Sequence, residues 1–314
     1  MDKRVNSSGN LAADITKSAS KQTYYTIRFM VDHGRVMDAY RAYGYIRWVD
    51  DVIDAEAGQR EERIAFANRQ KSLLDSCYRG EIPGDLCDEE WMLVDLVRSD
   101  TEKNSGLQTY LHDMMDVMVF DAQRRDEIIS QAELSRYSHK LGKAVTEALY
   151  YFIGHDDPSP RHEARYLAVT AAHITHMLRD AIEDVDSGYF NIPREYLQAR
   201  GISPSDVTSQ AYREWVCGRV QLARRYFELA RECTSQVRNL RCRLAGYAYT
   251  ARFEWMLRAI ERDNYCLRSE YPERKSFAAG LWMMWHTLTS VFTLPTIRNG
   301  SRKLAPQPVR VDKK

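Results

Sequence analysis

Two short acidic segments constrain the fold of this chain more than any other feature of its sequence. Residues 49–54 read VDDVID and residues 179–184 read RDAIED, so each segment carries two aspartates four residues apart. On a helix this spacing puts both carboxylates on one face, where like charges repel unless a cation holds them. Two such pairs facing each other across a helical bundle would form an oxygen-rich site suited to Mg²⁺ and to a diphosphate bridged by it.

Composition favours a mostly helical protein. The 314 residues are enough for one large domain with a sizeable core or for two small domains, and the 15 Gly and 9 Pro are few. The net charge of +1 provides no overall field that would attract nucleic acid. No stretch approaches the roughly 20 apolar residues of a membrane span, and residues 1–13 lack the apolar core of a signal peptide. The six cysteines show no metal-type spacing, so we expect free thiols in a reducing, cytoplasmic setting.

The pattern along the chain predicts an all-α protein with loose ends. We expect a flexible polar arm over residues 1–18, a single domain over 19–293 and a basic tail over 294–314. The expected helices cover residues 20–31, 35–55, 61–79, 87–104, 107–121, 131–153, 161–186, 208–233, 236–267 and 274–292. The clearest loop, residues 154–160, is too short to separate two domains.

The first acidic pair lies near the C-terminal end of an otherwise apolar helix. The helix dipole opposes carboxylates at that end, which favours a bound cation. Asp50 and Asp54 are flanked by Val49 and Ile53, and aspartates in such a setting are rarely left unpaired. Arg47 shares the face of Asp50, where its guanidinium could contact a phosphate or neutralise an aspartate. For either segment taken alone, a solvated acidic helix end is the alternative.

The second acidic pair repeats this arrangement and adds histidines. Asp180 and Asp184 follow Arg179, and His173 and His176 precede Asp180 by two turns and one turn on the same face. A zinc site built on His176 and Asp180 is one alternative, but a carboxylate-dominated site prefers Mg²⁺ or Mn²⁺.

These segments resemble motifs of the squalene/phytoene synthase family. Residues 41–54 (RAYGYIRWVDDVID) are similar to its first aspartate-rich motif, and residues 176–184 (HMLRDAIED), continuing to YFNIP at 189–193, are similar to its second. Residues 20–25 (SKQTYY) are similar to its N-terminal Ser-Lys motif. Three further similar stretches are residues 115–121 (MDVMVFD), 137–139 (YSH) and 260–265 (IERDNY). The resemblance runs from about residue 20 to about residue 290, in the family's order.

The resemblance implies an isoprenoid-synthase helical bundle around a central cavity, with residues 19–293 as the catalytic domain. It implies a prenyltransferase that joins two allylic prenyl diphosphates (farnesyl or geranylgeranyl) head to head. The reaction would pass through a cyclopropylcarbinyl diphosphate, in the presence of Mg²⁺, to a squalene- or phytoene-type product and free diphosphate. NADPH is implied only for a squalene product. This chemistry needs neutralisation of the leaving group and a dry apolar chamber around the carbocation.

The resemblance also assigns roles to individual residues. Asp50 and Asp54 would hold Mg²⁺ for one diphosphate, and Asp180 and Asp184 would hold it for the other. The diphosphate oxygens would be contacted by Arg47 and Arg179, with hydrogen bonds from Tyr43 and Tyr265, and a phosphate would lie near Ser20, Lys21 and Thr23. Tyr137 matches the tyrosine that handles protons and stabilises cations.

Four positions depart from the family pattern. His173 and His176 stand where the family has Gln and Asn, so His176 either replaces a metal ligand or removes one. Lys143 and Thr146 stand where the family has glycines close to the substrate, and Lys143 could either reach solvent or reshape the prenyl pocket.

Several alternatives stay open at this point. The chain could ionise a single prenyl diphosphate and cyclise or transfer it, or it could be a catalytically silent binding or assembly factor. The segment 274–292, with Trp282, Met283, Met284 and Trp285, could rest on a membrane surface or pack in the core. The protein could be a monomer or a homodimer.

Overall fold

The computed structural model describes residues 2–55, 59–155 and 162–292. Within these ranges the chain is helical, and its one β-type pairing is an isolated bridge between Ile128 and Phe190. The prediction of an all-α protein is therefore confirmed. The predicted loop 154–160 falls mostly outside the described residues, and the predicted tail 294–314 falls entirely outside them.

The helices follow the expected order. Their bounds are α1 Asp2–Ala19, α2 Lys21–Met30, α3 Val36–Asp54, α4 Arg60–Arg79, α5 Asp88–Ser99, α6 Gly106–Arg124, α7 Gln131–Phe152, α8 Leu167–Arg179, α9 Ala181–Asp186, α10 Arg194–Arg200, α11 Gln210–Ser235, α12 Leu240–Arg262 and α13 Phe277–Phe292. Short 3₁₀ turns cover His33–Arg35, Glu163–Tyr166 and Pro272–Lys275.

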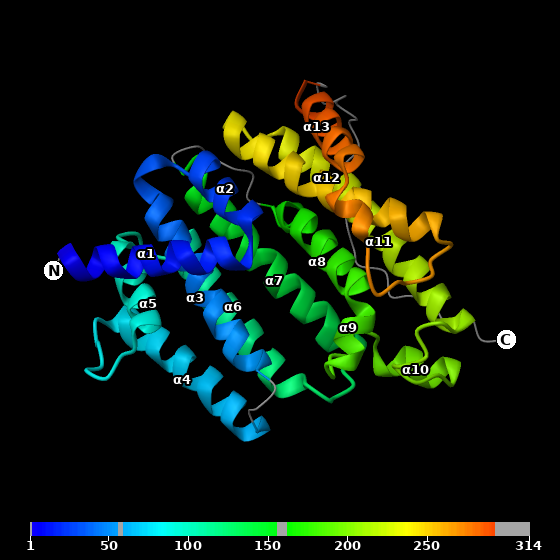
Figure 1. The fold of residues 1–314 in the computed structure, drawn as a ribbon, viewed down its shortest axis with the longest axis horizontal. Coiled ribbons are helices and arrows are strands. Elements are labelled where there is room, and N and C mark those ends of the chain that lie inside the picture. Colours follow the sequence, from blue (N-terminus) through cyan, green and yellow to red (C-terminus); the bar gives the residue numbers. More distant parts are fainter. Residues whose placement is uncertain (1, 56–58, 156–161, 293–314) are drawn as a thin grey trace.

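Four helices run side by side through the middle of the molecule: α3, α6, α7 and α8 (Figure 1). The helices α4 and α5 flank α3 and α6 on one side, whereas α11, α12 and α13 lie beyond α8 on the other. Apolar residues form one core cluster around α3 to α6 and a second around α8, α11 and α12. Tyr137 on α7 packs against both clusters, so this side chain lies where the two halves of the bundle meet.

A glycine sets the close contact between α7 and α8. A Cβ atom added at Gly142 would overlap Oγ1 of Thr170 and crowd the Tyr166 carbonyl oxygen at 3.3 Å. The hydroxyl of Thr146 donates to the Gly142 carbonyl at 2.7 Å and so stays on its own helix. An apolar cavity of about 50 Å³ lies between the last turns of α7, the start of α8 and the first half of α12, and Thr146 helps to line it.

The structure corrects the expectation of a flexible arm over residues 1–18, because residues 2–18 belong to the helix α1, which packs across α3. The contact uses small and polar side chains: Ala12 is fully buried, and a Cβ atom at Gly44 would lie 3.1 Å from its backbone. The hydroxyl of Ser8 donates to Asp95 at 2.7 Å and accepts from Arg41 at 3.1 Å. These residues lack the large apolar side chains that mark a buried helix in a sequence.

The expected single helix over residues 161–186 is interrupted. A 3₁₀ turn precedes α8, and Asp180 separates α8 from α9 with backbone angles of φ −96° and ψ 3°. The expected helix 236–267 is shorter too, because α12 ends at Arg262 and both Asn264 and Tyr265 have positive φ. The six cysteines are free thiols. In the described part of the chain, no helix has the length and apolar character needed to cross a membrane.

Candidate active site

The first aspartate pair lies in the last turns of α3. The buried side chains of Val49 and Ile53 fix this end of the helix in the core, which leaves Asp50 and Asp54 at its edge. Arg47 forms an ion pair with Asp51 and a longer one, of 3.5 Å, with Asp50. The arginine predicted to contact diphosphate therefore pairs with aspartates of its own motif.

The second aspartate pair lies at the junction of α8 and α9. The backbone N–H of Asp184 donates to the Asp180 carbonyl at 2.8 Å, so the four-residue spacing still sets the two side chains one turn apart despite the break. Arg179 donates to both carboxylate oxygens of Asp180. Each pair is thus accompanied by one arginine from its own segment.

A third acidic residue, Asp121 on α6, lies between the two pairs. It accepts from the Arg124 guanidinium at 2.5 Å and from the Tyr137 hydroxyl at 3.1 Å. Arg124 also donates to Asn191 at 3.0 Å, and the Asn191 amide donates to Asp184 at 2.7 Å. These contacts connect α6, α7 and the second aspartate motif through side chains.

A tight turn after α9 connects the second motif to the first. A Cβ atom at Gly188, whose φ is +84°, would overlap the Asp126 carboxylate, so this turn requires glycine. The next residue, Tyr189, donates from its hydroxyl to Asp54 at 2.8 Å. The aspartate ends of α3 and α9 are therefore held together by a hydrogen bond between the two motifs.

The carboxylates of this cluster raise one another's pKa. Burial raises the pKa of Asp50 to about 7, and the nearby Asp54 and Asp121 add to the rise. Burial, together with Asp180 and Asp121, also raises the pKa of Asp184 to about 7. The pKa of Asp121 is raised by burial, against the opposing effect of Arg124. Aspartates from three helices thus share one electrostatic environment that a cation would stabilise.

The donor set suits Mg²⁺ held jointly by protein and diphosphate. Among the described residues, no three His, Cys, Asp or Glu side chains lie close enough together to hold a metal ion by themselves. Mg²⁺ is usually bound by one or two carboxylates together with substrate phosphates and water, so two separate aspartate pairs fit its needs. The expected oxygen-rich site is therefore two pairs rather than one closed protein cage.

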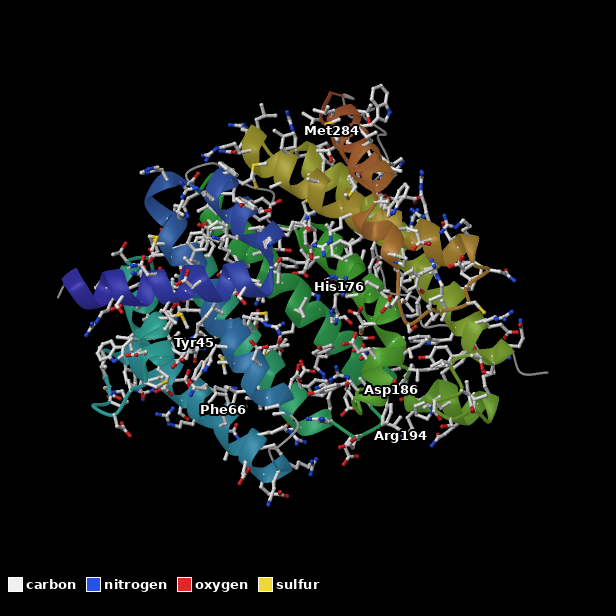
Figure 2. The ribbon with its side chains drawn as sticks, viewed as in Figure 1. Tyr45, Phe66, His176, Asp186, Arg194 and Met284 are labelled. Carbon is white, nitrogen blue, oxygen red and sulfur yellow. The ribbon has the colours of Figure 1, made fainter. Side chains whose placement is uncertain are left out.

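The two histidines of α8 lie against aromatic rings. His173 is buried and contacts Tyr137 edge-on, with ring centroids 4.9 Å apart. Burial and the nearby Arg124 and Arg219 lower the pKa of His173 to about 3, so its imidazole is neutral. His176 lies near the middle of the molecule (Figure 2). Its ring contacts that of Phe253 on α12, with centroids 4.6 Å apart.

The N-terminal Ser-Lys motif lies beside α3. Ser20 caps α2 by accepting from the Thr23 N–H at 3.2 Å, and the Thr23 hydroxyl donates to Ser20 at 2.9 Å. Thr23 also hydrogen-bonds to Tyr43, whose pKa is raised by burial. Lys21 is exposed. The motif therefore reaches α3 two turns before Asp50.

Two residues singled out in the sequence lie elsewhere. Tyr265 contacts Cys217 on α11, with Glu261 and Arg224 nearby, rather than the aspartates. Lys143 forms an ion pair of 3.2 Å with Asp113 on α6, so its ammonium is directed to a neighbouring helix.

Sequence reasoning gave no role to Asp121, Arg124, Tyr189 or Asn191. Asp121 ends the stretch 115–121 that resembles the family, and Arg124 follows it by one helical turn. The sequence signal for Asp121 and Arg124 is an acidic and a basic residue three positions apart, next to a stretch that resembles the family. Tyr189 and Asn191 belong to the stretch YFNIP that continues the second motif, but their partners come from α3, α6 and α9 and cannot be read from spacing.

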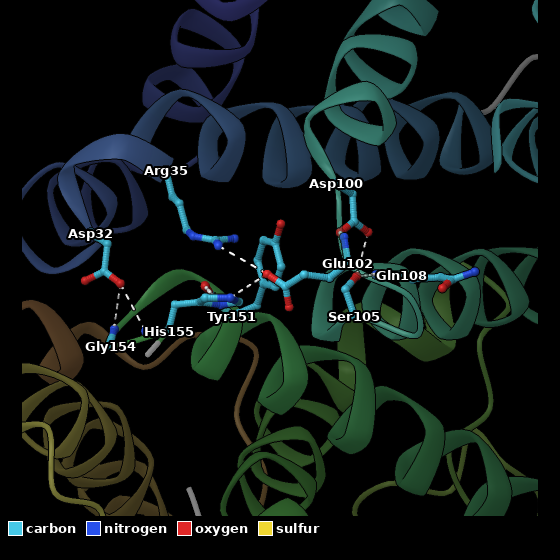
Figure 3. Close-up of polar contacts among 9 residues, drawn as sticks. All are labelled: Asp32, Arg35, Asp100, Glu102, Ser105, Gln108, Tyr151, Gly154 and His155. Carbon is cyan, nitrogen blue, oxygen red and sulfur yellow. Dashed lines mark hydrogen bonds and ion pairs between the residues drawn. The ribbon is translucent and has the colours of Figure 1, made fainter. Parts of the chain in front are cut away.

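A second polar cluster lies at the other end of the bundle, beside the N-terminal end of α3 and the C-terminal end of α7 (Figure 3). His155 and Arg35 pair with Glu102 at 2.6 and 3.4 Å, and Asp32 accepts from the backbone N–H groups of Gly154 and His155. An open hollow of about 530 Å³ lies beside these residues. Arg35 is paired with Glu102 and Arg241 with Asp32, which distinguishes this cluster from the aspartate end.

Comparisons with known proteins agree with this geometry. The family model of squalene/phytoene synthase matches residues 16–276. The presqualene diphosphate synthase of Zymomonas mobilis is 26% identical over 200 residues, which cover 64% of this chain and 65% of that protein. The chloroplastic phytoene synthase 3 of Zea mays is 23% identical over 272 residues, covering 82% of this chain and 61% of that protein. The matched stretch thus spans less than two thirds of either relative.

Solved structures show the same fold. The squalene synthase HpnC from Alicyclobacillus acidocaldarius superposes with a TM-score of 0.67 at 18% identity, covering 84% of this chain and 97% of that one. The germacradien-4-ol synthase from Streptomyces citricolor superposes with a TM-score of 0.50 at 14% identity, covering 84% and 90%. Because the family model covers most of the sequence, the chain belongs to the squalene/phytoene synthase family.

Proposed function

We propose that this chain is a Mg²⁺-dependent prenyltransferase that condenses two allylic prenyl diphosphates head to head. The substrates would be farnesyl or geranylgeranyl diphosphate, and the reaction would pass through a cyclopropylcarbinyl diphosphate to a squalene- or phytoene-type product. The observation that carries the proposal is the pairing of two aspartate motifs across the bundle. Tyr189 hydrogen-bonds to Asp54, Asn191 hydrogen-bonds to Asp184, and the half-buried Asp121 lies near both pairs.

Each of the two aspartate motifs, with its arginine, would bind one of the two diphosphates. Asp50 and Asp54 would hold Mg²⁺ for one diphosphate, and Asp180 and Asp184 for the other. The metal, when bound, would neutralise charge on the leaving diphosphate. His176 stays a proposed additional ligand, one turn before Asp180.

Arg47 and Arg179 would exchange their present partners for phosphate oxygens, because a diphosphate offers more negative charge than a single carboxylate. On the α2 side, a phosphate of one of the two substrates would be contacted by Ser20, Lys21, Thr23 and Tyr43. Tyr265 would join them only if the segment after α12 moves from its contact with Cys217.

The side chains around Tyr137 would face the carbocation. Its hydroxyl is oriented by Asp121, and its ring lies 4.8 Å from the Arg124 guanidinium and 4.9 Å from His173. Because His173 is neutral, it adds no positive charge beside a developing cation. The apolar cavity near Leu149 lies ~18 Å further along α7, at 1.5 Å per residue, where the tail of a prenyl chain would end.

Product analysis tests the proposal. Purified enzyme is incubated with farnesyl or geranylgeranyl diphosphate and Mg²⁺, with and without NADPH, and the hydrocarbons, alcohols and diphosphate esters are identified. A product with twice the carbon number of the substrate supports head-to-head condensation, and an NADPH requirement would indicate squalene. A product of equal carbon number would overturn it in favour of a terpene synthase.

Control variants separate failure of the proposal from failure of the preparation. Asp184→Asn should abolish product formation, whereas Glu102→Gln, at the opposite end of the bundle, should leave it intact. If the folded protein binds the diphosphate substrate but yields no product with either chain length, the chain is a silent binding factor and the proposal is wrong.

A further inference from the structure

One arginine of the core, Arg219 on α11, has no acidic partner. Its neighbours on the same face of the helix are at most 1% exposed: Tyr212, Val216 and Ala223, at i−7, i−3 and i+4. In the described part of the chain the Arg219 guanidinium makes no ion pair and no hydrogen bond. It lies over the ring of Trp215 instead, 5.9 Å from the ring centre. A charged side chain therefore takes a position where the helix pattern calls for an apolar one.

The charge of Arg219 is not compensated by the protein. Burial lowers its pKa from 12.5 to about 10, so the group is still charged at neutral pH. Arg47 and Arg124, which pair with carboxylates, instead have a raised pKa. Because a buried charge without a counter-charge is strongly unfavourable, such groups are usually paired or hold a ligand. Arg219 therefore needs an anion that the described residues do not supply.

Two helices independently place Arg219 on the inner side of the second aspartate motif. On α11, burial and the nearby Asp184 raise the pKa of Tyr212, and Arg219 follows Tyr212 by two turns, or ~10 Å. On α8, Arg219 lies close enough to His173 to help lower its pKa, and His173 precedes Asp180 by two turns, again ~10 Å. The two helices pack against each other, so both routes lead to the same place.

The side chain of Arg219 leans toward the aspartates. Helical side chains tilt toward the N-terminus of their own helix. The contact with Trp215, one turn before Arg219, agrees with that direction. The N-terminal end of α11 is the end near Asp184. The guanidinium is therefore directed from the middle of the bundle toward the second motif.

A second group without a partner lies next to this guanidinium. The Nε2 atom of His173 is buried and has no hydrogen-bond partner in the described ranges, and the whole residue is 8% exposed. The imidazole is neutral, so it can donate one N–H to an oxygen without adding charge. Arg219 itself is partly accessible, which leaves room for a ligand beside it. A guanidinium and an imidazole side by side form a donor set for anionic oxygens.

We propose that Arg219 and His173 form a metal-free anion subsite, on the inner side of the second aspartate motif, that binds phosphate oxygens of a prenyl diphosphate. The aspartates would hold this diphosphate through Mg²⁺ from one side, and Arg219 would contact it from the other. The inference rests on the proposed function for the identity of the ligand. The subsite itself rests on two unpartnered side chains that lie outside both aspartate-rich segments.

The surroundings favour a ligand with one charged end. Tyr137 contacts His173 at 4.9 Å, and the face of α11 around Arg219 is otherwise apolar or aromatic. A prenyl diphosphate brings only hydrocarbon beyond its phosphates, whereas a dinucleotide would bring ribose hydroxyls and a polar base into this space. Without a bound anion, the charge of Arg219 would also raise the energy of a carbocation near Tyr137.

Diphosphate binding without metal tests the inference on the full chain. Isothermal titration calorimetry with inorganic diphosphate in EDTA measures the dissociation constant, and the parent should bind. Arg219→Met keeps the length of the side chain but not its charge, so it should weaken binding at least about tenfold. Arg219→Lys should recover part of the affinity. His173→Leu should weaken binding about threefold, whereas His173→Gln, which keeps an N–H donor, should not.

The matched control is Arg225→Met on the same helix, because the Arg225 side chain is 65% exposed and pairs with Glu228 at 3.6 Å. It should leave the metal-free affinity unchanged. Asp50→Asn with Asp184→Asn should preserve or strengthen this affinity, because the double variant removes negative charge but not the subsite. Circular dichroism verifies the fold of each variant. If Arg219→Met does not fold, the comparison of His173→Leu with His173→Gln decides the question.

Competition identifies the ligand. A thio analogue of farnesyl diphosphate should displace inorganic diphosphate in EDTA, and NADP⁺ should not. The inference is overturned if the parent does not bind diphosphate without metal, if Arg219→Met binds as tightly as the parent, or if NADP⁺ alone displaces the ligand. A chain that binds diphosphate through Arg219 but yields no product of doubled carbon number would contradict the proposed condensation and support the subsite.

Discussion

The two ends of α3 hold charged clusters of opposite character. At the N-terminal end, Arg35 and His155 share Glu102, and Arg241 pairs with Asp32 at 2.5 Å. At the C-terminal end, ~28 Å away along the helix, aspartates from three helices face one another. The first cluster is complete as it stands, because each charge has an opposite partner. The second contains more negative charge than its arginines neutralise.

The pKa values express this difference. Burial raises the pKa of Asp32, but the backbone N–H groups of His155 and Gly154 and the Arg241 guanidinium outweigh it, so the net pKa is lowered. Burial and neighbouring carboxylates instead raise the pKa of Asp50 and Asp184 to about 7. A carboxylate that stabilises the fold has a lowered pKa, whereas a raised pKa at both aspartate motifs indicates groups kept for a ligand.

The largest expected effect is the loss of activity on changing the aspartate end. Asp50→Asn or Asp184→Asn should each lower kcat/KM by at least about 10³-fold, because each removes a charge that would hold the metal and its diphosphate in the proposed reaction. The melting temperature of the ligand-free protein should stay the same or rise, since a carboxylate with a raised pKa is lost. Steady-state kinetics and differential scanning calorimetry measure both quantities. Activity within tenfold of the parent would remove that aspartate from the metal site.

One tyrosine-to-aspartate hydrogen bond at each end allows the effect of its loss on kcat/KM to be compared directly. Tyr189 donates to Asp54 at 2.8 Å, and Tyr78 donates to Asp100 at 3.0 Å. Tyr189→Phe should lower kcat/KM by about 10–100-fold, because second-sphere partners of metal ligands typically contribute that much. Tyr78→Phe should leave kcat/KM near the parent value. Equal effects of the two variants on kcat/KM would mean that neither hydrogen bond is specific to catalysis.

At the opposite end a substitution should cost stability rather than activity. Asp32→Asn removes the charge that accepts from two backbone N–H groups and from Arg241. The free energy of unfolding, measured with urea, should fall by about 1–3 kcal/mol. The folded variant should keep its kinetic constants. Glu102→Gln, which changes a more exposed partner, should cost less. A selective loss of kcat in Asp32→Asn would show that this cluster takes part in the reaction.

The pH dependence of stability should differ between the ends. The folded-state pKa of Asp50 and Asp184 is raised from 3.8 to about 7, so their stabilising contribution is present below 3.8 and is lost as the pH rises through about 7. Asp32 has a lowered pKa, so its contribution is present above 3.8 and is lost at lower pH. Ionisation of Asp50 and Asp184 should therefore lower the melting temperature of the ligand-free protein as the pH rises from about 4 to about 8.

Mg²⁺ with diphosphate should offset this loss by a few degrees at pH 8, and EDTA should reverse the gain, because both ligands favour the ionised carboxylates. The double variant Asp50→Asn, Asp184→Asn is the control and should show neither the pH-dependent loss nor the metal response. A metal response that persists in this variant would place the metal elsewhere.

The smallest expected effect concerns His173. Its pKa of about 3 keeps the imidazole neutral in the working range, so it should contribute no ionisation to the pH profile of kcat/KM. The profile of His173→Gln should superimpose on that of the parent within error. A profile that loses a limb near neutral pH in this variant would show that His173 titrates in the free enzyme.

Much of the fold followed from local patterns. The bounds of α3, α4, α6 and α7 lie within a few residues of those expected, because their apolar periodicity and their Gly or Ser boundaries are local signals. The helix α1 was missed, because its fully or nearly buried residues, such as Ala12 and Ser8, are small or polar and give no strong apolar period. The break at Asp180 was missed too, since the residues around it have no helix-stopping signal.

The sequence by itself determined which residues the candidate site contains: two aspartate pairs at helical spacing, each with its arginine, in the order of a known family. Only the tertiary structure decided how the pairs meet. Asp121 and Arg124 come from α6 and Tyr137 from α7, and Tyr189 reaches Asp54 across 135 positions of the chain. The physical reason is that helical spacing fixes which side chains share a face, whereas contacts between helices depend on packing, which no local pattern encodes.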